Sequence, residues 1–176
     1  SGSMINDNKI ESARNLVATM FRSVEKIPQV RILANVWSSN TAGEVGITHV
    51  RTEGECNRIS AGGSFCYTPT HEALRYSAKQ LAKYSGKKLL IMITDGYPQY
   101  HNNGNSISER ILVDLAVEEY RKGQKYCRNM MCINISPNNN AEKEDFKKIF
   151  GFEPPNCEKN LKRIFKKNYV EFPGME

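Results

Sequence analysis

The chain has 176 residues and a mass of 20.0 kDa, which is the size of one globular domain with a single sizeable core. Apolar residues make up 39%, charged residues make up 25% and the mean hydropathy is -0.56, a balance that excludes a disordered or low-complexity chain. The longest apolar run covers only residues 89–93. This excludes a membrane span, and we expect no membrane partner.

The formal net charge of +6 comes from 25 Lys and Arg residues against 19 Asp and Glu residues. Part of this excess lies in residues 159–167, which contain five bases and no acid. Leu161, Ile164 and Phe165 recur there at helical spacing, so the bases belong to the outer face of a helix. That face is either simply solvated, which is the more common case, or a docking surface. We do not expect a nucleic-acid partner.

The five cysteines are an odd number in a chain too large to need disulfide staples. This favours reduced thiols and a cytoplasmic location. Cys127 and Cys132 are the nearest approach to a metal-binding pair, but four residues separate them, whereas a C-x-x-C zinc site has two. The polar opening of the chain at residues 1–4 is not that of a signal peptide.

Periodicity predicts the first half of the chain as a helix, a hairpin and a second helix. Apolar residues recur every three or four positions over 9–27, and Pro28 closes that helix. Residues 30–37 and 45–50 are rich in strand-forming side chains and pair as a hairpin across a short polar turn. A second amphipathic helix begins near Thr70 and covers 70–84.

The second half continues the alternation of strands and helices. Residues 88–94 are continuously apolar, which predicts a strand near the centre of a parallel sheet, with Asp95 at its carboxyl end. Ser106 with Glu109 has the spacing of a capping box at the start of the next helix. Strands follow at 130–136 and 169–172. The sequence therefore predicts a doubly wound α/β fold with a mostly parallel sheet between helices.

Three short polar segments meet at one edge of such a sheet, because loops at the carboxyl ends of parallel strands converge. They are Ser1-Gly2-Ser3, Thr68-Pro69-Thr70 and Asp95-Gly96. Hydroxyls with a single carboxylate are hard oxygen donors, which suit Mg²⁺, or Mn²⁺ or Ca²⁺, rather than zinc. Because this set of ligands carries only one negative charge, the bound cation keeps a net positive charge and can accept a carboxylate from another molecule.

At these segments the chain resembles the von Willebrand factor A (VWA) domain family over residues 1–172. The family's metal-ion-dependent adhesion site (MIDAS) uses D-x-S-x-S after the first strand, a threonine before a helix and an aspartate after the fourth strand. Residues 1–4 (SGSM) resemble the end of the first motif, residues 68–74 (TPTHEAL) the second and residues 93–98 (ITDGYP) the third.

The resemblance implies metal-ligand roles for Ser1, Ser3, Thr68 and Asp95. We expect Thr70 to be the N-cap of its helix instead, because a hydroxyl there can satisfy a free backbone N–H. The resemblance also implies one VWA-like domain over 1–176, cut from a longer parent and lacking part of the family's first strand and last helix. The aspartate of D-x-S-x-S would precede Ser1. Alternatively, Ser1-Gly2-Ser3 is left from an expression tag; the internal motifs do not depend on this choice.

The function that the resemblance implies is metal-dependent binding of a protein partner, without catalysis by this domain. The motifs are most similar to those of intracellular bacterial and phage A domains of the magnesium chelatase, cobaltochelatase and MoxR-associated kind. Such domains work with AAA+ ATPases. We therefore expect a cytoplasmic module that binds an acidic loop of a partner, and an AAA+ ATPase is one candidate.

An alternative is a small α/β hydrolytic enzyme that uses Cys66 and His71. No acyl-transfer motif surrounds either residue, and their ordinary interpretations are a buried thiol and a histidine on a helix surface. Residues 61–64 (AGGS) lack the pattern of a nucleotide-binding loop, so we expect no nucleotide cofactor. Tyr97, Tyr100 and His101 either rim a partner interface or fold the turn at Pro98.

Overall fold

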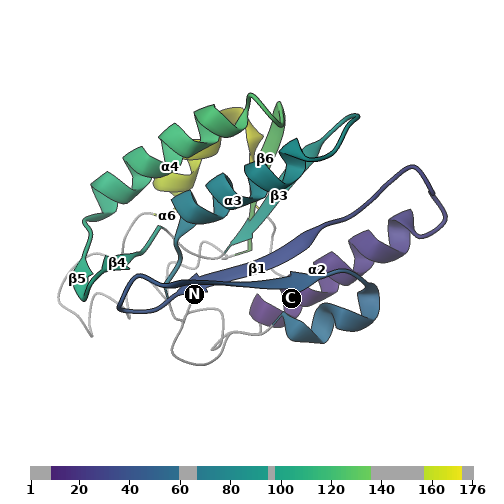
Figure 1. Ribbon diagram of the computed structural model, residues 1–176, viewed down its shortest axis with the longest axis horizontal. Coiled ribbons are helices and arrows are strands. Elements are labelled where there is room, and N and C mark those ends of the chain that lie inside the picture. Colours follow the sequence, from purple (N-terminus) through teal and green to yellow (C-terminus); the bar gives the residue numbers. More distant parts are fainter. Residues whose placement is uncertain (1–8, 60–66, 95–97, 136–156, 172–176) are drawn as a thin grey trace.

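The computed structural model describes residues 9–59, 67–94, 98–135 and 157–171. Its elements alternate between helices and strands in the order that the sequence predicts (Figure 1). The described helices include α2 (Lys9–Val24), α3 (Thr70–Ala82), α4 (Glu109–Gly123) and α6 (Cys157–Phe165), with short 3-10 turns η1 (Glu53–Arg58) and η2 (Lys166–Asn168). No helix among these residues is long and apolar enough to cross a membrane.

Three parallel strands form the main described sheet, in the order β3 (Leu89–Thr94), β6 (Asn129–Asn134), β7 (Tyr169–Glu171). Leu89 pairs with Asn129, and Cys132 pairs with Tyr169. The protein is thus of mixed α/β class, with a parallel sheet flanked by helices, which is compatible with a Rossmann-like fold.

The strand at 88–94 does not lie at the centre of this described sheet, contrary to the prediction. β6 is the middle strand, and β3 is at an edge of the three described strands. The burial of β3 alternates: Leu90, Met92 and Thr94 are buried, the residues between them are half-buried, and Leu89 before them is 54% exposed. An unbroken apolar run therefore does not by itself place a strand in mid-sheet.

The predicted hairpin is confirmed as β1 (Ala34–Ser39) and β2 (Val45–Val50), which pair antiparallel. Its two faces meet different helices, because side chains alternate along a strand. Trp37 of β1 packs on the cluster formed with α3, α4 and α6, while Ala34 and Val36 pack on the cluster formed with α2 and η1. The helices accordingly cover opposite faces of the hairpin.

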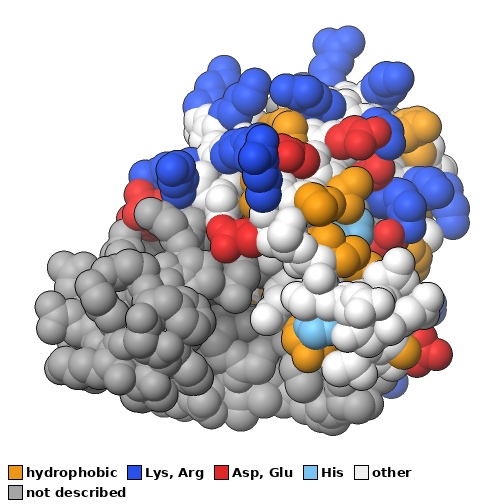
Figure 2. Space-filling model, turned by 90° about the vertical axis from the view of Figure 1, so that its left-hand side faces the viewer, with side chains coloured by type: hydrophobic (Ala, Val, Ile, Leu, Met, Phe, Trp, Pro, Cys, Tyr) orange, Lys and Arg blue, Asp and Glu red, His pale blue; other side chains and the backbone are white. Residues whose placement is uncertain are grey.

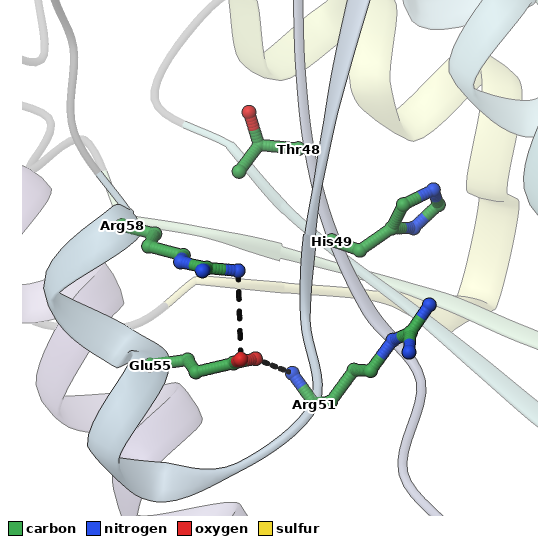
Figure 3. Close-up of a pocket in the computed structure, with 5 residues that line it drawn as sticks. All are labelled: Thr48, His49, Arg51, Glu55 and Arg58. Carbon is green, nitrogen blue, oxygen red and sulfur yellow. Dashed lines mark hydrogen bonds and ion pairs between the residues drawn. The ribbon is translucent and has the colours of Figure 1, made fainter.

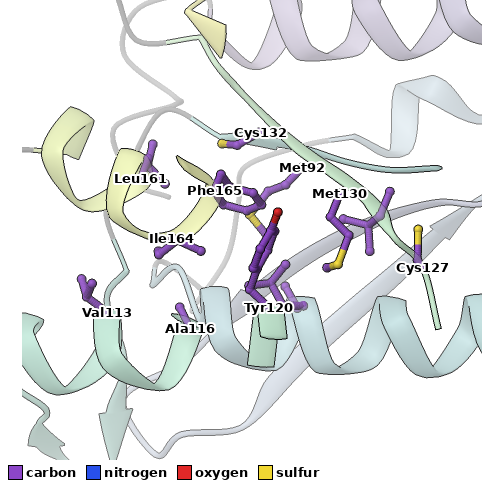
Figure 4. Packing of buried hydrophobic residues seen from close by; sticks show 13 residues of the cluster. Met92, Val113, Ala116, Tyr120, Cys127, Met130, Cys132, Leu161, Ile164 and Phe165 are labelled. Atoms are coloured by element: carbon purple, nitrogen blue, oxygen red, sulfur yellow. The ribbon is translucent and has the colours of Figure 1, made fainter. Parts of the chain in front are cut away.

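The larger core cluster lies between the main sheet and the helices α3, α4 and α6 (Figure 4). Tyr120 of α4 meets Phe165 of α6 edge to face, with ring centroids 5.4 Å apart. The side chains of Met92, Met130 and Cys132 reach this cluster from the strands. The core thus joins α3, β3, α4, β6, α6 and β7.

A two-residue turn at Asn103-Gly104 connects the short strands β4 (His101–Asn102) and β5 (Asn105–Ser106). Both turn residues have positive φ, at 48° and 81°, as a type I′ hairpin requires. Ser106 therefore belongs to a strand and is not the predicted helix cap. Ser108 takes the N-cap position of α4, although its side chain makes no capping hydrogen bond.

Candidate functional site

The segment that contains Thr68 lies where three parts of the chain meet. Tyr67 forms an antiparallel bridge with Ser39, the last residue of β1, through hydrogen bonds of 3.1 and 3.2 Å. One residue further on, the Thr68 carbonyl accepts a hydrogen bond of 2.9 Å from the backbone N–H of Gln99. The loop before α3 is therefore fixed between the end of β1 and the chain that follows β3.

Thr68 itself is 6% exposed, and Pro69 behind it is fully buried. Its carbonyl also accepts a hydrogen bond of 2.8 Å from the N–H of Thr70. Helix α3 begins at Thr70, with Pro69 at the N-cap and no side-chain cap. The prediction of Thr70 as N-cap is therefore wrong: this buried threonine is the first helical residue.

The strand ends beside this segment are also buried. Thr94 closes β3, and its carbonyl accepts a hydrogen bond of 2.9 Å from Ile135 N–H, just after β6. At the end of β6, the Asn134 amide donates to the Tyr169 hydroxyl across 2.9 Å. These bonds hold β3, β6 and β7 together at their carboxyl edge.

Of the four predicted metal ligands, Thr68 lies among the described residues, whereas Ser1, Ser3 and Asp95 lie outside them. Asp95 follows Thr94 directly in the chain, and Gln99, four residues beyond Asp95, is bonded to Thr68. In the described ranges there is no group of three or more His, Cys, Asp or Glu side chains placed to hold a metal ion.

His71 is buried in the first turn of α3, and not on the helix surface as its ordinary interpretation had it. Its ring meets Tyr100 edge to face at 5.1 Å, and Nε2 lies 3.7 Å from a Glu72 carboxylate oxygen. Burial lowers the pKa of this imidazole, although the Glu72 charge opposes that effect. Cys66, the other residue of the enzyme alternative, lies outside the described residues.

Three buried polar atoms around the Thr68 segment have no hydrogen-bond partner: Ser39 Oγ, His71 Nδ1 and His101 Nδ1. The His101 ring lies 4.2 Å from the ring of Tyr67, so these atoms come from the elements that meet at Thr68. Buried polar groups are normally satisfied, and an unpaired one calls for an explanation such as a bound water, an ion or a functional role. From the sequence, the loop from Ser39 to Thr41 was only a possible wall of the site, since nothing there distinguishes Ser39 from any serine at a strand end.

Tyr100 connects the β1–β2 turn to this region. Its hydroxyl donates a hydrogen bond of 2.8 Å to the Gly43 carbonyl. Gly43 has a φ of +88°, and a Cβ at this position would lie 2.7 Å from the His101 carbonyl oxygen. Tyr100 and His101 thus lie against the β1–β2 turn.

A surface pocket of about 490 Å³ lies elsewhere, between β2 and η1 (Figure 3). Several of its polar groups already have partners. Glu55 accepts a hydrogen bond of 2.8 Å from Arg51 N–H and lies 3.4 Å from the Arg58 guanidinium. His49 Nδ1 is 2.8 Å from Asn35 Oδ1. Among the described residues, none of the buried polar atoms without a partner lies in this pocket.

No family model, curated protein or solved structure matches the chain.

Proposed function

We propose that this chain is a metal-dependent protein-binding domain of the VWA kind, with no catalysis of its own. The observation that carries the proposal is the hydrogen bond between Gln99 N–H and the Thr68 carbonyl. It joins the threonine segment to Gln99, four residues beyond Asp95 in the chain, which supports the proposal that the two motifs form one site. The alternation of helices and parallel strands supports the same assignment.

The proposed ligands are Ser1, Ser3, Thr68 and Asp95. Their chemistry fits Mg²⁺, or Mn²⁺ or Ca²⁺, because hydroxyl and carboxylate oxygens are hard donors. When bound, the cation supplies a positive centre that accepts a carboxylate. The protein's part is to present Thr68 on a backbone fixed by two hydrogen bonds.

The proposed partner carries an exposed Asp or Glu on a loop, and an AAA+ ATPase is the class that the VWA resemblance suggests. We also propose a cytoplasmic location. It is supported by three buried cysteines, Cys56, Cys127 and Cys132, all of which are free thiols. Reduced thiols are the norm in the cytoplasm.

Metal binding can be tested with Mn²⁺ alone, by measuring the free ion with electron paramagnetic resonance during a titration. Asp95→Asn and Thr68→Val should each weaken Mn²⁺ binding at least about tenfold, the loss that follows removal of a metal-site group. Asp114→Asn is the matched control, because Asp114 lies on the surface of α4 and pairs with Arg163. Equal affinity of the control and both site variants would contradict the proposed metal site.

Partner chemistry can be tested with two labelled peptides that differ in one residue, Glu or Gln, within a glycine-rich loop. Fluorescence anisotropy should show binding of the Glu peptide in Mg²⁺, and its loss in EDTA or with Asp95→Asn. The Gln peptide should not bind, since a neutral amide is a poor ligand for the cation. Binding of both peptides in EDTA would contradict the mechanism.

A further inference from the structure

Each parallel strand of the main sheet begins next to a basic turn. The turn before β3 carries two lysines, the turn before β6 carries a lysine and an arginine, and η2 before β7 carries two lysines. Because the strands are parallel neighbours, their amino ends lie at one edge of the sheet. We call this the amino-edge surface; it consists of Lys87, Lys88, Lys125, Arg128, Lys166 and Lys167.

The strand register brings these bases close together. Leu89 pairs with Asn129, so Lys88 and Arg128 stand side by side, one residue before the paired positions. The Lys88 charge reaches Cys127, where it acts to lower the thiol pKa against the larger, raising effect of burial. β7 begins opposite Cys132, three residues into β6, and η2, which directly precedes β7, contacts β6. Lys166 and Lys167 therefore lie beside the amino half of β6.

Acidic residues do not neutralise this surface. Residues 79–88, 121–128 and 159–168 contain no Asp or Glu. The nearby ion pairs of Lys122, Lys162 and Arg163 use acids that lie outside these segments. No ion pair joins the six bases of the amino-edge surface to any described acid, and all are exposed except Lys88, which is half-buried.

Two exposed tyrosines lie among these bases. Tyr126 is 50% exposed between Lys125 and Arg128, and Tyr84 is 38% exposed in the turn before Lys87. The Arg31 guanidinium lies 5.6 Å from the centre of the Tyr84 ring and adds a further positive charge. Basic side chains interleaved with accessible aromatic rings are the combination that holds single-stranded nucleic acid, through its phosphates and its unpaired bases.

We propose that the amino-edge surface binds single-stranded nucleic acid, with the bases neutralising phosphates and Tyr126 stacking on a nucleobase. The surface lies opposite the Thr68 region, since one follows the carboxyl ends of the strands and the other precedes their amino ends. In Figure 1 the turn before β3 lies at the upper right and the turn before β6 lies at the top of the molecule. Figure 2 shows the other side, the left-hand side of Figure 1, where Lys and Arg side chains also gather along the top. The sequence alone did not suggest this partner, because the three basic segments meet only in the folded sheet.

The test is fluorescence anisotropy with labelled oligouridine and oligothymidine about 20 nucleotides long, at salt concentrations from about 50 to 200 mM. Working in EDTA makes the result independent of the proposed metal site. The triple variant Lys88→Gln/Arg128→Gln/Lys166→Gln should lose at least about tenfold in affinity. Its log–log salt slope should become shallower by about 2, because each lost phosphate contact to a single strand contributes roughly 0.7.

The matched control removes three exposed charges elsewhere, as Lys26→Gln/Arg51→Gln/Arg110→Gln. It should bind within about twofold of the natural chain, because these bases lie off the amino edge. Tyr126→Ala should weaken binding about tenfold and Tyr126→Phe should not, since stacking needs the ring and not the hydroxyl. Circular dichroism of every variant verifies that the fold is kept.

Three results would overturn the proposal. The first is no measurable binding at the lowest salt, and the second is an equal loss in the edge variant and the control variant. The third is displacement of the oligonucleotide by polyglutamate at equal charge, together with unchanged binding by Tyr126→Ala. That third result would assign the surface to an acidic polypeptide instead.

Discussion

The buried imidazole of His71 couples the Thr68 region to pH. Burial lowers its pKa below the ordinary 6.5, so the unfolded chain binds this proton at a higher pH than the folded chain does. The contribution of His71 to the free energy of unfolding is therefore intact above about pH 6.5 and falls as the pH drops from there through the folded pKa.

We predict that His71→Phe flattens this dependence. Phenylalanine keeps an aromatic ring against Tyr100 and removes the unpartnered Nδ1 atom. Urea unfolding at about pH 7.5 and about pH 5.5 should show a smaller loss of stability in the variant than in the natural chain. His49→Phe, at an exposed histidine, is the control. An unchanged pH dependence in His71→Phe would mean that other groups cause it.

Two glycines allow the stability cost of backbone strain to be measured apart from the cost of a close contact. Gly43 and Gly86 both have a φ of +88°, but of these two only Gly43 has other atoms within 4 Å of an added Cβ; the nearest is the His101 carbonyl oxygen. Gly86→Ala should cost about 1–2 kcal/mol of stability from left-handed backbone strain. Gly43→Ala should cost about 1–3 kcal/mol more, because the turn must move away from His101. Equal losses in urea unfolding would show that the contact is relieved without cost.

At the scale of elements, helix α4 packs against the core through one of its faces. Leu112 is 1% exposed and belongs to its buried face, whereas its neighbour Ile111 is 53% exposed. Leu112→Ala should lower the free energy of unfolding by about 2–5 kcal/mol, because it leaves a cavity in the core. Ile111→Ala should change it by no more than about 0.5 kcal/mol. Similar losses in the two variants, measured by urea unfolding, would contradict the described packing of α4.

Helices were easier to predict than their ends. The periodicity of apolar residues placed α2, α3 and α4 correctly, because burying one stripe of a helix needs a 3.6-residue repeat. Caps depend on one local bond, and two predictions of them are wrong. Ser106 has the capping-box spacing with Glu109, yet it pairs with His101 in a hairpin. Thr70 begins α3 itself because Pro69 takes the preceding position.

For the whole molecule, the alternation of strands and helices predicted the α/β class, but composition did not predict strand order. The strand at 88–94 was expected in mid-sheet from its apolar run, and β6 is the middle strand of the three described. A strand has an apolar sequence when any neighbouring element buries it, including helices that cover a face of the sheet. The apolar run therefore does not indicate the position of the strand within the sheet. Likewise, the sequence predicted that the Thr68 and Asp95 motifs lie at one edge of the sheet. The hydrogen bond from Gln99 to Thr68 could not be predicted, because it depends on how the folded loops meet.

The central claim is that one divalent cation binds beside Thr68. Mn²⁺ is paramagnetic and broadens the amide signals of nearby residues, so a two-dimensional ¹H–¹⁵N spectrum locates it directly. We predict that Mn²⁺ selectively broadens the signals of Tyr67, Thr68, Thr94 and Gln99, and that excess Mg²⁺ restores them. The signals of Tyr84 and Tyr126, at the amino edge, should stay sharp. Uniform broadening, or broadening centred on residues distant from Thr68, would contradict the account.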